Sequence, residues 1–295
     1  MHPYILSCCS IVDLTPERLA QRDVIFAPFH FTLNGVEHTD DMGISLSSND
    51  FYQSMYDGAT VSTSQVNVEE YLQYFRPYLE DGNDILHLAL SSGLSGSFNS
   101  ARIAAETLRD EFPERKIYIV DTLGASAGAG LLVDAVADLR DSGATIDEAY
   151  HWVEENKLKL HHWFTASDLT WFIKGGRISR AAGWFGTALK ICPVLNVDIM
   201  GRLVPRFKIR GKQHSLKELV NQMIEHADGG TSYTGKCFIS NSACYDDAQF
   251  VAKEIEKTFP HLNGPVQISN IGTTIGSHCG PGTVALFFWG DPRIN

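Results

Sequence analysis

Residues 84–120 have the sequence DILHLALSSGLSGSFNSARIAAETLRDEFPERKIYIV, and this stretch decides the fold class. Two short apolar runs, 84–90 and 116–120, have the length of buried strands, and the second is rich in β-branched residues. Between them, residues 99–112 carry apolar side chains at helical spacing. A strand, a helix and a second strand in this order predict a βα unit of an α/β protein with a parallel sheet.

Helix starts are well marked on both sides of this stretch. Thr15 is a capping hydroxyl before the first-turn proline Pro16, and Asn67 is a cap before two glutamates. Thr145 and Glu148 have the spacing of a capping box. Short apolar runs alternate with these helices, so the first half of the chain predicts repeated βα units.

The pattern changes near residue 160. Residues 194–200 and 203–209, joined by a Gly201-Arg202 turn, predict an antiparallel hairpin. The other elements expected after it are helices at 216–226 and 246–259 and strands at 237–240, 266–271 and 284–289. We therefore expect a two-lobed α/β fold, with an N-terminal parallel-sheet domain at 1–160 and a C-terminal α/β domain with a mixed sheet at 161–295. The cleft between the lobes is the expected place for a ligand.

Charge and composition exclude several classes of function. The 295 residues include 24 Lys and Arg against 35 Asp and Glu, a formal net charge of −11. Such a surface repels phosphate backbones and anionic lipid, so we expect no nucleic-acid partner and no polybasic membrane contact. No apolar run reaches the ~18 residues of a membrane span, and the six cysteines include no C-x-x-C pair. With no signal-peptide pattern at the start, these features predict a soluble cytoplasmic protein with free thiols.

The most informative segment for function is 91–97 (SSGLSGS), between the predicted strand and helix. Ligands of open α/β sheets bind at the carboxyl ends of strands, where the N–H groups and the dipole of a helix start favour an anion. Ser92 and Ser95 add hydroxyl donors there, and Gly96 lets the backbone come close to a ligand. A serine-rich turn that only caps the helix explains the same residues equally well. A hydrolase elbow needs G-x-S-x-G, and here the second glycine comes one residue early.

A second hydroxyl cluster, residues 62–65 (STSQ), lies just ahead of the helix expected to begin near Asn67. Thr63 and Ser64 would then converge with Ser95 on one small anion such as a carboxylate. Hydroxyls are neutral donors, so they bind a carboxylate without the salt dependence of Lys or Arg. Taken alone, this cluster is better explained as cap and turn residues.

Two further segments carry candidate polar groups. Residues 174–179 (KGGRIS) place Arg177 after paired glycines, a pattern that forms either an anion nest of backbone N–H groups or a helix end with a surface arginine. Residues 276–282 (GSHCGPG) place His278 in a Gly/Pro-rich loop, where its near-neutral pKa suits hydrogen bonding or proton transfer. Neither segment has the spacing of a P-loop or of a metal site, and His161 with its neighbouring histidine does not make one.

Two other patterns are weaker. Residues 128–130 (GAG) lack the third glycine of a dinucleotide fingerprint. We therefore expect neither a nucleotide cofactor nor a metal. Aromatic side chains suited to an acyl tunnel, although more economically assigned to the core, are Phe26, Phe29, Phe31, Trp184 and Phe185.

Taken in order, these segments resemble the DegV family of bacterial fatty-acid-binding proteins, nearly from end to end. The family opening Asp-Ser-x-x-Asp-Leu is matched at 10–14, with Cys9 in place of its first Asp. The other matched motifs are Thr-Ser-Gln at 63–65, Ser-Ser-x-Leu-Ser-Gly at 91–96, Lys-Gly-Gly-Arg-Ile at 174–178 and His-x-Gly-Pro-Gly at 278–282. Ser97 and Cys279 replace threonines of the family pattern, and because all three replacements are small we expect the pocket to persist.

The resemblance implies a two-domain α/β fold that buries a long-chain fatty acid between its lobes and needs no other cofactor. Some family members present this lipid to a separate ATP-binding kinase subunit, which makes an acyl phosphate. Arg177 would then contact that partner or steady the transferred phosphoryl group. The residues that would bind or approach the carboxylate are Thr63, Ser64, Ser92, Ser95, Gly96 and His278.

Two other functions fit parts of the sequence. Ser95 and His278 would be the nucleophile and base of an acyl hydrolase. A regulator that binds another small anionic ligand would use the same helix starts. The leading interpretation is a lipid-binding protein without catalytic residues of its own, because the chain offers no ATP-binding motif.

Overall fold

The computed structural model describes residues 4–179 and 191–294, and its first sheet has four parallel strands in the order β2-β1-β6-β7. The strands are Ile5–Cys9 (β1), Val24–Ala27 (β2), Ile85–Ala89 (β6) and Ile117–Asp121 (β7). The helix between β6 and β7 is α4, Ser97–Glu111. The predicted βα unit is thus confirmed, and β6 is buried along its whole length, as expected for a strand covered on both faces.

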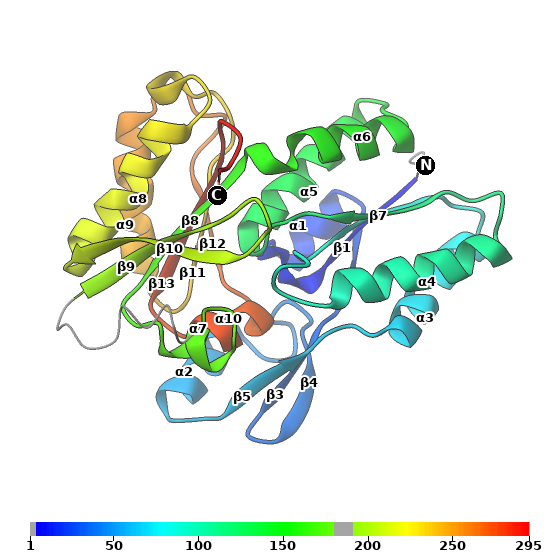
Figure 1. The fold of residues 1–295 in the computed structure, drawn as a ribbon, viewed down its shortest axis with the longest axis horizontal. Helices are drawn as coiled ribbons and strands as arrows, with labels where there is room; N and C mark the ends of the chain where they lie inside the picture. The colour runs from blue at the N-terminus through cyan, green and yellow to red at the C-terminus, as the bar shows by residue number, and fades with distance from the viewer. Residues whose placement is uncertain (1–3, 180–190, 295) are drawn as a thin grey trace.

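Helices cover both faces of this sheet (Figure 1). The pair α3 and α4 packs on β6 from one side, and α6 packs on β6 and β7 from the other, beside α5. The predicted caps are present, since Thr15 accepts a hydrogen bond from the amide of Arg18 and capping boxes begin α3 at Asn67 and α6 at Thr145. The helices of this half are Pro16–Gln21 (α1), Ser48–Tyr56 (α2), Val68–Glu80 (α3), Ser126–Asp141 (α5) and Ile146–Asn156 (α6).

The second sheet has six strands in the order β10-β9-β8-β13-β11-β12 and is antiparallel except for the pair β11 and β12. The expected mixed sheet and the β9–β10 hairpin are therefore confirmed. Helices α8 (Lys212–His226) and α9 (Tyr245–Thr258) pack on one face. The strands are Leu160–Ala166 (β8), Ile191–Val197 (β9), Leu203–Arg210 (β10), Phe238–Asn241 (β11), Gln267–Asn270 (β12) and Thr283–Trp289 (β13).

The buried helix α5 lies between the two sheets and also packs on β8, β11 and β13. A Cβ at Gly128 would lie 2.3 Å from Nε2 of His162, and a Cβ at Gly130 would lie 2.4 Å from the carbonyl oxygen of Val12. Close packing therefore requires both glycines, and this packing accounts for the Gly-Ala-Gly pattern. One core cluster includes residues from both sheets, so a domain boundary at 160, where β8 begins, stays a prediction.

A small antiparallel sheet with the order β4-β3-β5 was not expected from the sequence. Its strands are His30–Leu33 (β3), Val36–Thr39 (β4) and Val61–Ser64 (β5). Two short helices, α7 (Thr170–Lys174) and α10 (Thr273–Cys279), lie beside it (Figure 1). Thr63 and Ser64 lie just ahead of α3, as expected, but they are the last two residues of β5 and not part of the helix start itself.

Candidate functional site

A cavity of about 640 Å³ is lined by the six-stranded sheet, the small sheet and the segments that follow β6 and β7. The apolar part of its wall includes Phe29, Leu90, Phe164, Phe172, Ile275 and Phe287. All the residues that the sequence singled out for a carboxylate or its transfer also line it: Thr63, Ser64, Ser92, Ser95, Gly96, Arg177 and His278. The fold thus brings together residues from four separate segments of the chain.

His278 reaches the cavity from the last turn of α10, so its expected place in a loop is wrong. Its Nε2 lies 2.8 Å from Oγ1 of Thr63, and its Nδ1 lies 3.3 Å from Nη1 of Arg177. Arginine can only donate, so Nδ1 is the acceptor and the ring proton lies on Nε2. The histidine therefore donates to Thr63, which leaves the threonine hydroxyl proton for a ligand.

The environment of His278 keeps its imidazole neutral. Burial and, to a smaller extent, the nearby charge of Arg177 together lower the pKa of His278 to about 4. A Cβ at Gly175 would lie 2.3 Å from Nδ1 of His278, so only glycine fits beside the ring. At neutral pH the site thus offers a ligand a neutral donor chain rather than an imidazolium.

Arg177 lines the cavity and links the loop after β6 to the end of α7. Its Nε and Nη2 donate to the carbonyl oxygen of Leu94 at 3.1 and 3.0 Å, and its Nη1 donates to the carbonyl oxygen of Gly175 at 2.7 Å. The backbone N–H groups of Gly175, Gly176 and Arg177 all donate to carbonyl oxygens of α7. These amides end the helix, so the anion nest considered for this segment is not formed.

The loop between β6 and α4 carries Ser92, Ser95 and Gly96 at the carboxyl end of a parallel strand. Oγ of Ser95 accepts the backbone N–H of Ser97 at 3.2 Å, which gives the first amide of α4 a partner and holds the hydroxyl at the cavity wall. A Cβ at Gly96 would lie 2.5 Å from Oε1 of Gln65, so glycine lets that side chain approach the loop. Gln65 also lines the cavity and was not among the predicted site residues.

Behind this loop lies a buried polar chain that the sequence did not reveal. The hydroxyl of Tyr71 is 2.8 Å from Oγ of Ser97 and 3.6 Å from Sγ of Cys9. The same sulfur lies 3.6 Å from Nε2 of His87, whose Nδ1 is 2.8 Å from Oγ of Ser7. Burial raises the pKa of Cys9 to about 11 and lowers that of His87 to about 3, so both groups are uncharged. Two of the three departures from the family motif, at positions 9 and 97, therefore contact one tyrosine.

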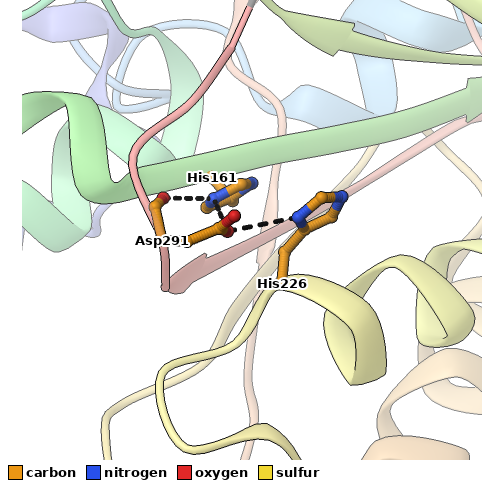
Figure 2. A group of neighbouring side chains, drawn as sticks. All are labelled: His161, His226 and Asp291. Atoms are coloured by element: carbon orange, nitrogen blue, oxygen red, sulfur yellow. Dashed lines mark hydrogen bonds and ion pairs between the residues drawn. The ribbon is translucent and has the colours of Figure 1, made fainter.

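A possible metal-ligating group lies outside the cavity lining: His161 of β8, His226 of α8 and Asp291 after β13 (Figure 2). Oδ1 of Asp291 is 3.2 Å from Nε2 of His161 and 3.1 Å from Nδ1 of His226. The indole N–H of Trp163 donates to Nδ1 of His161, so Nε2 carries the proton, which it donates to the backbone oxygen of Asp291 at 2.8 Å. These contacts hold the segment after β13 against β8 and α8, which accounts for the proximity of the three side chains.

The aromatic residues suggested for an acyl tunnel have different locations. Phe29 lines the cavity, whereas Phe31 packs with Phe51 under the small sheet. Phe26 is half-buried on β2. Trp184 and Phe185 lie outside the described residues. The other phenylalanines of the cavity wall, which the sequence did not single out, are Phe164 of β8, Phe172 of α7 and Phe287 of β13.

The match to known proteins extends over nearly the whole chain. Residues 10–291 match the family model of DegV, described as uncharacterised proteins of the DegV family. The chain belongs to the DegV family. A DegV domain-containing protein of Clostridium perfringens is 38% identical over 293 residues, which is 99% of each chain. The resemblance noted in the sequence motifs is thereby confirmed.

Solved DegV structures have the same fold. A DegV family protein of Thermus thermophilus, described for its fatty acid binding, has a TM-score of 0.86 and 25% identity, with 98% of this chain and 100% of the other covered. The fatty acid kinase (Fak) B3 protein of Streptococcus pneumoniae, loaded with linoleic acid, has a TM-score of 0.83 and 21% identity, with 99% and 100% covered. At that identity the second comparison concerns the fold alone.

Two further findings concern the cysteines and the lengths of the helices. Its six cysteines are free, as the sequence predicts. Within residues 4–179 and 191–294, each helix is too short or too polar to cross a bilayer.

Proposed function

We propose that this DegV protein binds a long-chain fatty acid in the cavity and presents the carboxylate to a separate kinase subunit. The observation that carries the proposal is the make-up of the cavity wall, which is mostly aromatic and aliphatic but includes the hydroxyls of Thr63, Ser64 and Ser95. Burial against the apolar wall stabilises a bound hydrocarbon chain, and the hydroxyls donate hydrogen bonds to a carboxylate. The fatty acids bound by the Thermus and Streptococcus relatives support the same class of ligand.

In this proposal the carboxylate lies against the serine loop and the end of β5. Thr63 donates its hydroxyl proton, and the neutral ring of His278 behind it orients that hydroxyl. Ser64, Ser92, Ser95 and Gly96 line the same cavity and would supply the remaining contacts to the carboxylate. No formal charge has to be buried opposite the carboxylate, apart from the half-buried Arg177, which is already bonded to Leu94.

Acyl-phosphate formation requires a second protein, because the chain has no P-loop to hold ATP. A carboxylate oxygen attacks the γ-phosphorus of ATP held by that subunit, the bond to the β,γ-bridging oxygen breaks, and ADP leaves. Arg177, at the cavity wall beside His278, is the cation placed to meet the transferred group. The structural neighbour named as the fatty acid kinase (Fak) B3 protein supports a kinase partner for this chain.

The test is to identify what the purified protein carries. The protein is denatured, extracted into organic solvent and analysed by mass spectrometry, and we expect intact long-chain fatty acid near one molecule per chain. Thr63→Ala should carry less, whereas Thr107→Ala, an exposed threonine of α4, should match the wild type. A water-soluble phosphorylated ligand, with no uptake of added fatty acid, would overturn the proposal.

The acyl hydrolase has less support. The described hydrogen bonds of His278 join Thr63 and Arg177, and that of Ser95 comes from the amide of Ser97, so no described bond links the nucleophile to its base. A fatty acyl ester incubated with the protein should therefore remain intact. Turnover abolished by Ser95→Ala would replace the binding function with hydrolysis.

A further inference from the structure

The helix that carries His278 is held at its other end by two buried carboxylates. The N–H of Gly272, the N-cap of α10, donates to Oδ1 of Asp13 at 2.8 Å, and the N–H of Thr274 donates to Oδ2 of Asp40 at 3.1 Å. Asp13 is 6% exposed and Asp40 is 1% exposed. Both come from the first half of the chain, whereas α10 belongs to the second.

Such carboxylates are costly to bury, so their placement needs a physical reason. Burial raises the pKa of Asp13 to about 7 and also raises that of Asp40. The first N–H groups of α10 have no partners within the helix, and the positive end of the helix dipole lies there. The carboxylates satisfy those amides, and the helix start offsets part of the cost of burying them.

Asp13 also connects α10 to the start of α5. Its Oδ2 accepts a hydrogen bond from the hydroxyl of Ser126, the first residue of α5 and part of the cavity wall. Asp13 and Ser126 have φ values of +48° and +58°, in the left-handed region that side chains other than glycine disfavour. Both residues of the Ser126–Asp13 hydrogen bond therefore have an unfavourable backbone conformation.

The two ends of α10 are therefore fixed by different partners. Asp13 and Asp40 hold the amino end, and Thr63 contacts His278 on the last turn. The helix has seven residues, which spans about 10 Å. Because α10 is short, a displacement of its amino end also displaces the imidazole of His278 at its last turn. Such a displacement is enough to break the 2.8 Å contact between His278 and Thr63.

We propose that Asp13 and Asp40 are positioning residues, whose carboxylates hold the amino end of α10 and thereby set the place of His278 on the cavity wall. The consequence for the lipid rests on the proposed function, because a displaced His278 no longer orients Thr63. The consequence for the ring itself holds whatever the ligand is.

The test follows the His278 ring by NMR in the full-length protein. In Asp13→Ala and Asp40→Ala the ring leaves its buried contact with Thr63, so the pKa of His278 should rise from about 4 toward its ordinary value of 6.5. Asp13→Asn keeps an acceptor for the Gly272 amide and should restore the low pKa. Asp57→Ala, at the exposed end of α2, is the matched control and should change nothing.

Two outcomes would overturn the proposal: an unchanged pKa of His278 in folded alanine variants, or a rise that the asparagine variant does not reverse. If the alanine variants fail to fold, Asp13→Glu and Asp40→Glu take their place, because one extra methylene displaces the carboxylate. An unchanged titration in both would then overturn it.

Lipid affinity provides a second readout. If Asp13 acts through His278, the loss caused by Asp13→Ala should be absent in a His278→Gln background, whereas additive losses would contradict the proposal. A moved His278 pKa without any fatty acid binding in the wild type would refute the proposed function and leave the positioning role intact.

Discussion

Thr63 shows how much a single side chain depends on its neighbours at this site. Its hydroxyl would be an ordinary strand-end group if His278 did not lie 2.8 Å away with its proton on Nε2. The Nε2 proton of His278 is donated to a lone pair of the Thr63 oxygen, so the hydroxyl proton of Thr63 is available to a ligand. Ser95 is oriented in a comparable way, because it accepts the amide of Ser97.

Removing either hydroxyl should weaken fatty acid binding. A hydrogen bond to a charged group contributes about 1.5–3 kcal/mol, so Ser95→Ala and Thr63→Ala should each raise the dissociation constant by roughly tenfold or more. The measurement is displacement of a fluorescent fatty acid. Ser45→Ala, an exposed loop serine, serves as the control. Unchanged affinity in both site variants would rule out these hydroxyls as carboxylate ligands.

The neutral state of His278 predicts how binding depends on pH. With a pKa of about 4, the ring stays uncharged from pH 6 to pH 8, so affinity should be nearly constant over that range. Arg177→Ala removes the cation that faces Nδ1, and the pKa of His278 should rise, which an NMR titration measures. Arg102→Ala, on the exposed face of α4, should leave the titration unchanged. Tighter wild-type binding at pH 6 than at pH 8 would indicate an imidazolium instead.

At the scale of elements, α5 is the helix whose sequence makes sense only in its surroundings. Glycine is less favourable than alanine in a helix by about 1 kcal/mol, yet α5 has Gly128 and Gly130 in its first two turns. The ring of His162 and the carbonyl of Val12 occupy the space that side chains would fill. The packing of the second sheet and of the segment after β1 on this helix outweighs its helix propensity.

Gly128→Ala should therefore destabilise the protein although alanine is the better helix former. The new methyl group would meet Nε2 of His162 at 2.3 Å and the ring of Phe287 at 2.7 Å, both in the core. We expect a loss of about 1–3 kcal/mol in the free energy of unfolding, as for other overpacked sites. Urea denaturation measures it, and a more stable variant would show that the core yields readily at this position.

At the scale of the molecule, α5 couples the two lobes. It packs on β8, β11 and β13 of the second sheet, and one core cluster includes residues of both sheets. We expect one cooperative thermal transition rather than two. Four of the five tryptophans lie after residue 160, so fluorescence follows mainly the second half of the chain, whereas circular dichroism follows both. Two separated midpoints would instead support independent domains divided near residue 160.

Buried histidines should make the whole molecule sensitive to acid. Burial lowers the pKa of His87 to about 3 and those of His161 and His278 to about 4. The unfolded chain then binds more protons, so stability present above pH 7 is lost as the pH falls from about 6.5 toward 4. Asp13 and Asp40 act in the opposite sense, because their raised pKa values make their contributions decline as the pH rises from about 4, for Asp13 up to about 7. The three histidines outnumber these two carboxyl groups.

Urea denaturation at pH 7.5, 6 and 5 measures this loss. His278→Gln should make the dependence on pH shallower, because one of the lowered pKa values is removed. His151→Gln, an exposed histidine of α6, should leave it unchanged. A stability that increases on acidification over this range would contradict the assignment.

The α/β class, the helix caps, the hairpin and most of the hydroxyl side chains that line the cavity could be predicted from the sequence. Strand length, helical spacing and capping act between near neighbours, so they are visible in a string of letters. The order of motifs also pointed to the family, and every residue it singled out for the carboxylate lines the cavity.

Only the tertiary structure decided how these residues work together. The small sheet has strands of four residues, and its β5 is too polar to show a clear alternation, so the strand that carries Thr63 was missed. His278 meets Thr63 across 215 positions of sequence, and its tautomer depends on Arg177, 101 positions away. Asp13 reaches Gly272 across 259 positions. Protonation, burial and contact at such distances follow from how the lobes pack, which no local pattern records.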